Sequence, residues 1–341
     1  MIPSLRSALL TVSRFTLQAS SVGSVAYSRL KETEEGTVHS VFDAAINILV
    51  PRGLVSLVPE AIQRGPLNIT LPIPAAESRM RSLGVRSGDK VKVHDFGLEL
   101  GERCTITLGS AAIYSSKQKF TAPMLANNEI EGNLEVMRQT GILFGNMSGI
   151  GELLALTLPS ADGAMRRKLN IFTASALPRI VELEQAFHSE EKKALAAAVR
   201  ELIGLGPGLT PSSDDMLAGL VLLCVLYSRN CGRSRHAVRL LAQATAEGAC
   251  GRTTILSEEF LRQASAGRGN EPIIRLCTAL LTGSAESVER ETRRVLQIGE
   301  SSGTDMILGI TIGTMFCLSK QSNLAKVNYY EHSSNREKID L

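Results

Sequence analysis

A glycine- and proline-rich stretch at residues 204–219 constrains the fold of this chain more than any other part of the sequence. It reads GLGPGLTPSSDDMLAG, with three glycines at every second position. Glycine loses the most backbone entropy in a helix or strand, and proline has no N–H donor, so the first half is predicted to be a loop. The residues from Met216 to Tyr227 are almost wholly apolar, which predicts a buried helix after the loop.

The start of this helix is marked by Ser212. Ser212 and Asp215 have the Ser-x-x-Asp spacing of a capping box, in which side chains satisfy the first N–H groups of a helix. A glycine-rich loop that runs into a helix N-terminus presents backbone donors and a partial positive charge. This combination suits a carboxylate or a phosphate group.

The same arrangement occurs again at residues 299–309, which read GESSGTDMILG and lead into a second apolar run. Aligning the two stretches matches Ser212 with Ser302, Asp215 with Asp305, Met216 with Met306 and Gly219 with Gly309. We interpret the two stretches as an internal half-repeat and expect both helix starts to line one cleft. Gly309 and Gly313 stand four residues apart, and we expect them to permit close helix packing.

Composition excludes several classes of function. With 37 basic and 34 acidic residues, the net charge of +3 is too balanced for a nucleic-acid or anionic-membrane partner. Six cysteines without CxxC spacing indicate reduced, mostly buried thiols. No apolar run approaches the ~20 residues of a membrane-spanning helix, and no cleavage site follows the basic residues of 1–31. We therefore expect a cytoplasmic protein.

The hydrophobic period divides the chain. It is close to two residues over 22–114, with one helix at 75–83, and it becomes helical after the polar segment 115–123. We expect an α+β fold, in which a mainly antiparallel β domain at 1–120 precedes a larger, mostly helical domain at 121–320 and a polar, frayed tail at 321–341. The predicted strands are 37–42, 46–50, 54–58, 67–71, 90–96 and 103–108. The predicted helices are 128–144, 179–187, 190–203, 214–227, 234–247, 254–266, 273–282, 285–298 and 305–318.

Asp215 and Asp305 are the candidate catalytic residues, although each could instead serve only as a capping residue. The candidate substrate-binding residues surround them: Gly206, Gly208, Thr210, Ser212, Ser213, Asp214, Arg252, Ser302, Gly303 and Thr304. Because carboxylates repel a bare anion, the expected ligand has an anionic end for the N–H groups and an N–H or hydroxyl end for the aspartates. No metal-ligand spacing occurs, and Mg²⁺ held through waters by Asp214, Asp215 and Asp305 is the one metal option. We interpret the glycine-rich segment 145–151 as an ordinary connector.

The pattern GLGPGLTPSSDDMLAG at 204–219 resembles the signature of the bacterial family that includes the AllH-type subunit of oxamate carbamoyltransferase. The segments SSGTD at 301–305, VHSVF at 38–42 and INI at 46–48 are similar to other recurring patches of that family. The resemblance covers roughly residues 20 to 320. One position departs from the family pattern, since Ser213 stands where the family usually has glycine.

The resemblance implies a transferase subunit that acts with two other subunits, one of them similar to acyl-CoA synthetases. The implied reaction transfers a carbamoyl group from oxalurate to phosphate and gives oxamate and carbamoyl phosphate, in anaerobic allantoin breakdown. Two other functions remain open: a non-catalytic binding or scaffolding subunit, and an independent amide hydrolase or lyase.

Overall fold

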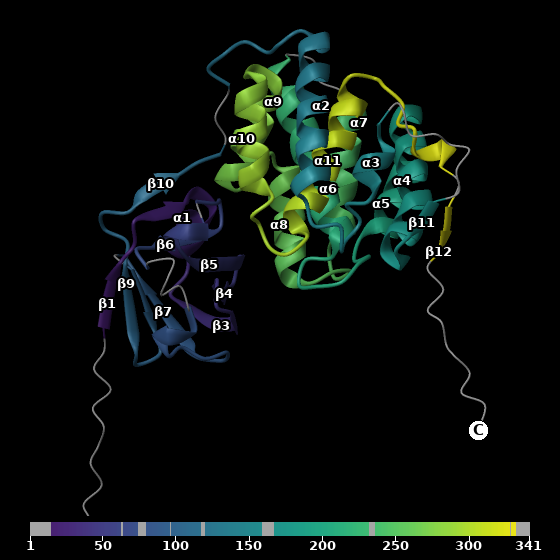
Figure 1. Ribbon diagram of the computed structural model, residues 1–341. Coiled ribbons are helices and arrows are strands. Elements are labelled where there is room, and N and C mark those ends of the chain that lie inside the picture. Colours follow the sequence, from purple (N-terminus) through teal and green to yellow (C-terminus); the bar gives the residue numbers. More distant parts are fainter. Residues whose placement is uncertain are drawn as a thin grey trace, which may run out of the picture. The chain divides into compact units, whose positions relative to one another are not determined.

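The structure, a computed structural model, describes residues 15–62, 64–73, 80–95, 97–116, 120–158, 167–231, 236–327 and 329–331. The chain divides into two compact units, Met1–Ser115 and Ser116–Leu341 (Figure 1). The first is built on a sheet and the second is mainly helical, which confirms the predicted fold class. In the described part of the chain, no helix is long and apolar enough to cross a membrane.

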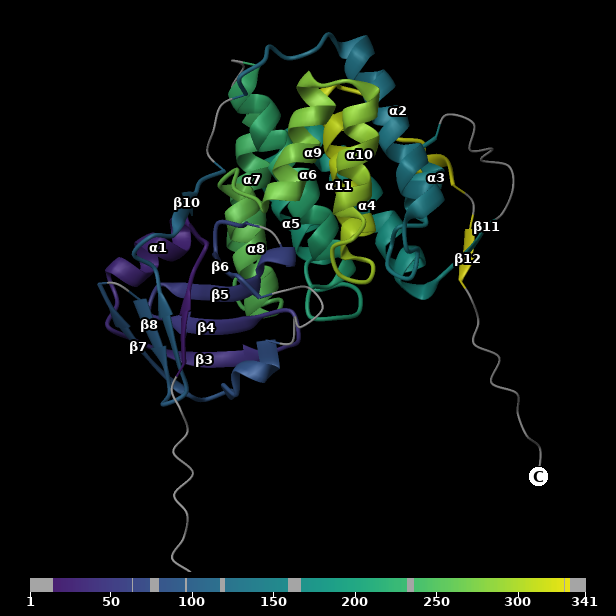
Figure 2. The same ribbon diagram turned by 60° about the vertical axis from the view of Figure 1, so that its left-hand side comes forward.

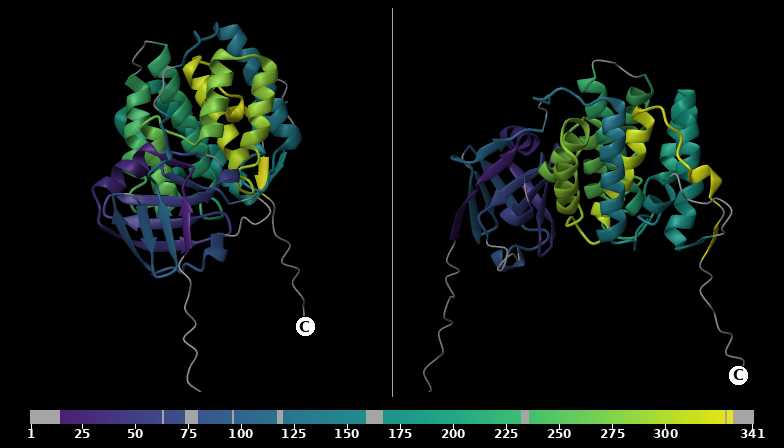
Figure 3. Two further views of the ribbon diagram at one scale, coloured as in Figure 1. Left: turned by 90° about the vertical axis from the view of Figure 1, so that its left-hand side faces the viewer. Right: turned by 45° about the horizontal axis from the view of Figure 1, so that its top comes forward.

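The N-terminal unit is built on a sheet, whose arrows are visible in Figure 3. The sheet has ten strands in the order β1-β9-β8-β7-β3-β4-β5-β6-β2-β10. The pairs β1/β9, β5/β6 and β2/β10 are parallel, and the other neighbours are antiparallel. The strands are β1 Phe15–Gln18, β2 Ser21–Gly23, β3 Glu35–Val41, β4 Ile46–Val50, β5 Gly53–Pro59, β6 Asn68–Leu71, β7 Lys90–His94, β8 Gly97–Leu100, β9 Cys104–Thr107 and β10 Ala112–Tyr114.

Residues of the predicted strands supply much of the core of this unit. Ile46, Ile48, Leu57 and Ile69 are fully buried, as alternating apolar positions of strands with a covered face should be. An unpredicted helix, α1 (Ser24–Lys31), packs against β2 and β5. Of the helix predicted at 75–83, the described end is the 3₁₀ turn η3 (Met80–Leu83), and residues 74–79 lie outside the described residues. Two further 3₁₀ turns in the chain are η1 (Glu60–Ile62) and η4 (Leu324–Lys326).

In the helical unit, α6 and α11 form the centre, and the helices that contact one or both of them surround this pair (Figures 1 and 2). Most predicted helices match within a few residues. The helices are α2 Asn127–Phe144, α3 Leu153–Leu156, α4 Ile171–Ser189, α5 Lys192–Leu202, α6 Ser212–Asn230, α7 His236–Gly248, α8 Ile255–Ser265, α9 Glu271–Thr282, α10 Ala285–Val295 and α11 Ser302–Cys317. All six cysteines of the chain are free thiols.

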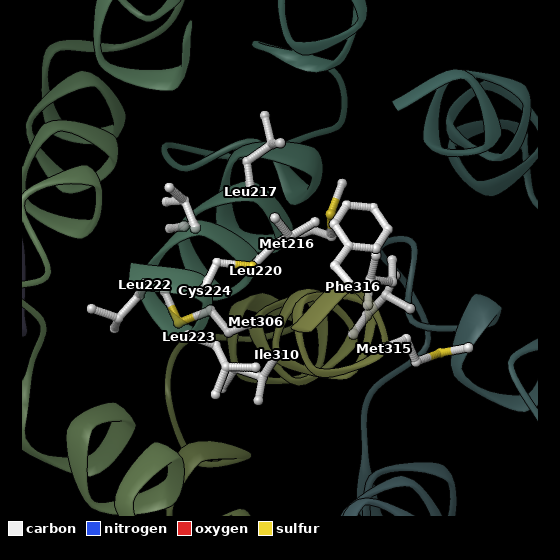
Figure 4. Close-up of a cluster of buried hydrophobic side chains, with 14 of the residues drawn as sticks. Met216, Leu217, Leu220, Leu222, Leu223, Cys224, Met306, Ile310, Met315 and Phe316 are labelled. Atoms are coloured by element: carbon white, nitrogen blue, oxygen red, sulfur yellow. The ribbon is translucent and has the colours of Figure 1, made fainter. Parts of the chain in front are cut away.

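The two central helices cross at glycines. A Cβ atom at Gly309 would lie 1.9 Å from the Met216 carbonyl oxygen, and one at Gly219 would lie 2.3 Å from the Met306 carbonyl oxygen. The expected close packing of Gly309 is therefore confirmed, and it is reciprocal between the matched residues of the half-repeat. Figure 4 shows side chains of both helices, Met216 and Met306 among them, in one buried cluster.

The C-terminal segment differs from the frayed tail predicted for 321–341. Ser322 is buried, and its backbone N–H donates to the Glu184 carboxylate over 2.6 Å. Leu324 is also buried, and β12 (Tyr329–Glu331) pairs in parallel with β11 (Arg167–Leu169). The buried Glu184 carboxylate on α4 accepts hydrogen bonds from this polar segment and holds it against the helical unit. The composition of the segment alone could not indicate this partner. Residues 332–341 lie outside the described residues.

Candidate functional site

The loops that lead into α6 and α11 meet at their tips. The hydroxyl oxygens of Thr210, before α6, and Ser302, the first residue of α11, lie 3.3 Å apart. The Thr210 hydroxyl also donates to the Asp215 carboxylate over 3.0 Å. Two segments some 90 residues apart in sequence thus bring their hydroxyls and carboxylates together, as the half-repeat predicted.

The two helix starts exchange hydrogen bonds. The Ser302 hydroxyl of α11 donates to the Asp215 carboxylate of α6, and the Ser212 hydroxyl of α6 donates to the Asp305 carboxylate of α11. Each serine therefore donates its hydrogen bond to the aspartate of the other helix. We call Asp215 and Asp305 the aspartate pair.

The predicted capping boxes are wrong. The N-cap positions belong to Pro211 and Ser301, neither of which makes a side-chain cap hydrogen bond, so Ser212 and Ser302 are the first helical residues. Their hydroxyls are directed across the helix crossing, because glycine contacts bring the two helices close enough for this. The carboxylates of Asp215 and Asp305 accept hydrogen bonds from the other helix instead of completing capping boxes on their own helices.

A third segment, residues 145–151, covers Asp305; we call it the covering loop. The Ile150 N–H donates to the Asp305 carboxylate over 2.9 Å, and the Gly151 N–H does so as well. A Cβ atom at Gly149 would lie 2.3 Å from an Asp305 carboxylate oxygen and 2.6 Å from the Ser212 hydroxyl. The interpretation of this segment as an ordinary connector missed its contact with the aspartate pair, although its glycines were the available signal.

Burial sets the protonation of the aspartate pair. It raises the pKa of Asp215 to about 7, and the negative charges of Asp305 and Asp214 add to the shift, while hydrogen bonds from Ser302 and Thr210 oppose it. Burial also raises the pKa of Asp305 to about 6, opposed by donors that include the Ile150 N–H and the Ser212 and Ser301 hydroxyls. Asp305 has more donors and therefore keeps its charge more readily than Asp215.

Asp214 and Ser213 face away from the pair. Asp214 accepts hydrogen bonds from the Gly204 N–H over 2.8 Å, from the Ser257 hydroxyl over 2.7 Å and from the Thr253 hydroxyl. The Ser213 hydroxyl contacts the carbonyl of Leu202, the last residue of α5, and the carbonyl of Leu205 in the loop that follows, the latter over 2.7 Å. Ser213 is helical, so it needs no left-handed conformation where the family usually has glycine. These two residues anchor the glycine loop to the helices around it.

The loop before α6 has the backbone that its glycines predicted. Gly204, Gly206 and Gly208 have φ angles of 83°, 115° and 96°, which other residues rarely adopt. The N–H groups of Gly206 and Gly208 donate to no described residue, and Gly208 is exposed. Arg252 is also exposed, and its carbonyl oxygen lies 2.9 Å from where a Cβ atom of Gly204 would stand. Gly208 and Arg252 are therefore in contact with solvent, and Gly206 is half-buried.

The predicted site residues fall into two layers. The outer layer is in contact with solvent and consists of Gly206, Gly208, Thr210, Arg252 and Ser302. The inner layer is buried and consists of Ser212, Ser213, Asp214, Asp215, Gly303, Thr304 and Asp305. In the buried layer the Gly303 N–H donates to the Ile298 carbonyl, and the Thr304 hydroxyl accepts from the Asn146 N–H over 3.0 Å. The half-buried hydroxyls of Thr210 and Ser302 are the groups that connect solvent to the aspartate pair.

A three-carboxylate magnesium site is not assembled. Asp214 is directed toward α8, away from Asp215 and Asp305, and within the described ranges no three His, Cys, Asp or Glu side chains gather as metal ligands.

The raised pKa of Asp215 makes the stability of the fold depend on pH. In the unfolded chain this carboxyl has its ordinary pKa of 3.8, against about 7 in the folded protein. The folded state binds the proton more tightly than the unfolded chain, so protonation of Asp215 stabilises the fold. This contribution is complete below pH 3.8 and is lost as the pH rises through about 7. We expect the Tm of the wild type to fall over this range more steeply than that of Asp215→Asn, whose amide does not titrate.

Thermal melts of both chains at a series of pH values measure this difference. Glu201→Gln, which removes an exposed carboxyl from α5, is the matched control and should follow the wild type. Parallel curves for the wild type and Asp215→Asn would show that Asp215 is ionised in the fold throughout.

Comparison with known families matches both units. A model of the family described as oxamate carbamoyltransferase subunit AllH matches residues 202–314, which include both glycine-rich loops and the aspartate pair. A model of the AllH family N-terminal domain matches residues 18–113 of the sheet unit. No solved structure matches the chain.

Proposed function

Because the chain belongs to the AllH family and is a subunit of oxamate carbamoyltransferase, we propose that the aspartate pair and the hydroxyls above it handle the carbamoyl group. The observation that carries the proposal is the reciprocal exchange of hydroxyl donors between two buried carboxyls at paired helix starts. A carboxyl with a pKa of about 7 holds a proton in about half of the molecules at neutral pH, which suits a group that accepts and releases protons.

The proposed reaction converts oxalurate and phosphate to oxamate and carbamoyl phosphate. A phosphate oxygen forms a bond to the ureido carbonyl carbon, and the bond from this carbon to the nitrogen of the departing oxamate breaks. The proton of hydrogen phosphate must leave the attacking group, and the departing nitrogen must gain one. A residue that receives the first proton and delivers the second therefore serves both halves of the transfer.

Asp215 is suited to this proton transfer through the hydroxyls that contact it. Thr210 and Ser302 are half-buried and both bind its carboxylate, so a ligand at these hydroxyls is one hydrogen bond away from the buried proton. Asp305, with a pKa of about 6 and more donors, would remain ionised and hold Ser212 in place. The different environments of the two carboxyls thus favour different roles.

The anionic part of the ligand fits the donors of the glycine loop. The N–H groups of Gly206 and Gly208 donate to no described residue, and Arg252, whose backbone lies beside Gly204, has an exposed and positively charged side chain. Oxalurate has a carboxylate for such donors and ureido N–H groups for hydroxyl and carboxylate acceptors. In this proposal the chain acts in allantoin breakdown with two other subunits, one of them similar to acyl-CoA synthetases.

A second candidate function is ligand binding without chemistry in this subunit. It is favoured by the burial of the aspartate pair, since Asp215 is 3% exposed and Asp305 is 0% exposed. The chain would then hold the substrate at Thr210 and Ser302 while a partner subunit supplies the reacting groups.

Titration with oxalurate, oxamate and carbamoyl phosphate, by calorimetry on the isolated chain and on the reconstituted complex, tests the binding site. Thr210→Val and Ser302→Ala each remove one hydroxyl and should weaken oxalurate binding about tenfold, as loss of about 1.4 kcal/mol would. Thr278→Val is the matched control, because the Thr278 hydroxyl donates only to a carbonyl of its own helix over 2.7 Å. Unchanged affinity in both site variants would refute the location.

A further inference from the structure

Asn170 connects the start of α4 to the covering loop. It is the N-cap residue of α4, and its side-chain oxygen accepts from the Thr173 N–H over 2.8 Å. Its side-chain amide donates to the Gly149 carbonyl over 2.9 Å and reaches the Met147 carbonyl over 3.5 Å. An N–H donor on one side and carbonyls on the other fix which end of the side chain is which. Both ends are bound by the protein, which suits Asn170 to holding the loop and not to binding a ligand.

The carbonyl that Asn170 holds lies directly before the N–H donors of Asp305. Gly149 is followed by Ile150, whose N–H donates to the Asp305 carboxylate over 2.9 Å, and then by Gly151, whose N–H also donates to it. The Gly149 carbonyl and the Ile150 N–H belong to one trans peptide unit, which is planar, so they point in opposite directions. A hydrogen bond that fixes the direction of this carbonyl therefore also directs the N–H toward Asp305.

The orientation of this peptide depends on its partners, because glycine allows the backbone more rotation than any other residue. A Cβ atom at Gly149 would lie 2.3 Å from an Asp305 carboxylate oxygen and 2.6 Å from the Ser212 hydroxyl, so the loop passes in direct contact with the aspartate pair. The hydroxyl of the buried Thr173 is a second, longer donor to the Gly149 carbonyl, over 3.4 Å. The start of α4 thus supplies both donors, and that of Asn170 is the shorter one.

Asp305 has carboxylates as titratable neighbours. Asp215 on α6 faces it across the helix crossing, and Asp214, the preceding residue on α6, is directed toward α8. At the end of the covering loop, the Glu152 carboxylate accepts from the Asn170 N–H over 3.0 Å. Negative charges at close range repel one another, so these neighbours disfavour a charge on Asp305.

Neutral hydrogen-bond donors oppose this effect at Asp305. Burial raises the pKa of Asp305 to about 6, and the Ile150 N–H is the largest of the influences that lower it. The others include the hydroxyls of Ser212 and Ser301 and the Gly151 N–H. The direction of the Ile150 N–H therefore affects the acidity of Asp305 more than that of any other single donor.

We propose that Asn170 is a positioning residue for the carbamoyl transfer, which turns the Gly149 peptide so that the Ile150 N–H stays on the Asp305 carboxylate. Asn170 acts on the aspartate pair through this peptide and not by contact with the substrate. The inference rests on the proposed function for its statement that Asp305 remains charged while Asp215 exchanges a proton. Without the Asn170 donor the peptide is free to turn, and Asp305 takes up a proton at a higher pH.

Asn170→Ser separates this role from helix capping. Serine caps a helix about as well as asparagine and adds no charge, but its side chain is too short to reach the Gly149 carbonyl as well. NMR titration of the full-length chain with isotope-labelled aspartates measures the pKa of Asp305, whose signal is assigned by its loss in Asp305→Asn. We expect this pKa to rise from about 6 by about one unit in Asn170→Ser.

Two further variants refine the measurement. Thr173→Val removes the longer donor to the Gly149 carbonyl and should raise the pKa of Asp305 less than Asn170→Ser does. Ser284→Ala removes the side-chain cap of α10 and is the matched control, because it weakens a helix start without touching the covering loop. It should leave the pKa of Asp305 unchanged.

The same shift should appear in the pH profile of the reconstituted carbamoyltransferase. A rise of about one unit lowers the charged fraction of Asp305 at pH 6 from about a half to about a tenth, so turnover of Asn170→Ser should fall about fivefold there. At about pH 8 the carboxylate is charged in both chains, and turnover should return close to that of the wild type. A residue that only stabilised the fold would lower turnover equally at both pH values.

The NMR titration needs no turnover, so this proposal and the proposed function can fail separately. An unchanged Asp305 pKa in Asn170→Ser would overturn the positioning role, whatever the activity. A raised pKa with wild-type turnover at both pH values would show that the transfer does not use the charge of Asp305, and would overturn the role of Asn170 in the reaction. A raised pKa together with near-normal turnover in Asp215→Asn would refute the acid–base chemistry and retain the effect of Asn170 on Asp305.

Discussion

Asp215→Asn is expected to lower the turnover number of the reconstituted carbamoyltransferase about 100- to 10,000-fold, the range that a general acid–base group contributes. The amide has nearly the size of the carboxyl, and its oxygen can still accept from Thr210 and Ser302, so the helix crossing is preserved. It cannot, however, carry a proton between the attacking phosphate and the departing nitrogen. The effect should therefore appear in turnover and leave assembly with the partner subunits intact.

The measurement is a carbamoyl-phosphate assay on complexes purified to the same subunit ratio. Glu201→Gln on α5 makes the same chemical change at an exposed position and should retain wild-type turnover. Near-normal turnover in Asp215→Asn would refute the acid–base role. If oxalurate binding still required Thr210 and Ser302 in that case, the chain would be a binding subunit and the chemistry would reside in a partner.

Much of the fold was predictable because the relevant signals are local. Short apolar runs bounded by the turn signal Pro51-Arg52-Gly53 located β4 and β5, and strong helix-forming residues located α5, since each pattern is complete within its own segment. The elements that were missed are defined by their neighbours. β2 and β10 have three residues each and depend on pairing, β10 with β2 and β2 also with β6, and α1 follows Gly23 without a side-chain cap.

The meeting of the two helix starts was predictable from the sequence, and the hydrogen bonds between them were not. The half-repeat indicated that Asp215 and Asp305 belong together, because matched loops with matched serines rarely arise from capping alone. It could not indicate that Ser212 and Ser302 bind across the crossing, since that depends on how closely two helices approach. The close approach of Gly149 to Asp305 was missed for the same reason, because it depends on tertiary packing between positions 156 residues apart in the sequence.

The second prediction with a large expected effect concerns the stability of the close crossing between α6 and α11. In Gly309→Ala the new methyl group would stand 1.9 Å from the Met216 carbonyl oxygen, and backbone atoms of α6 cannot yield without moving the helix. We expect a loss in the free energy of unfolding of about 3 kcal/mol or more, at the upper end of overpacking costs, even though alanine favours a helix over glycine by about 1 kcal/mol. Gly219→Ala, at 2.3 Å from the Met306 carbonyl oxygen, should behave similarly.

Gly132→Ala gives the matched control for this prediction. Gly132 lies within α2 with no atom within 4 Å of an added Cβ, so the same substitution should raise the Tm slightly through helix propensity alone. Thermal melts of the three alanine variants beside the wild type separate the two effects. If Gly309→Ala melted at or above the wild-type temperature, the close crossing would be wrong, and with it the hydrogen bonds that join Ser212 to Asp305 and Ser302 to Asp215. Those bonds exist only while the two helices stay in contact, so the stability of the fold and the proposed chemistry depend on the same pair of glycines.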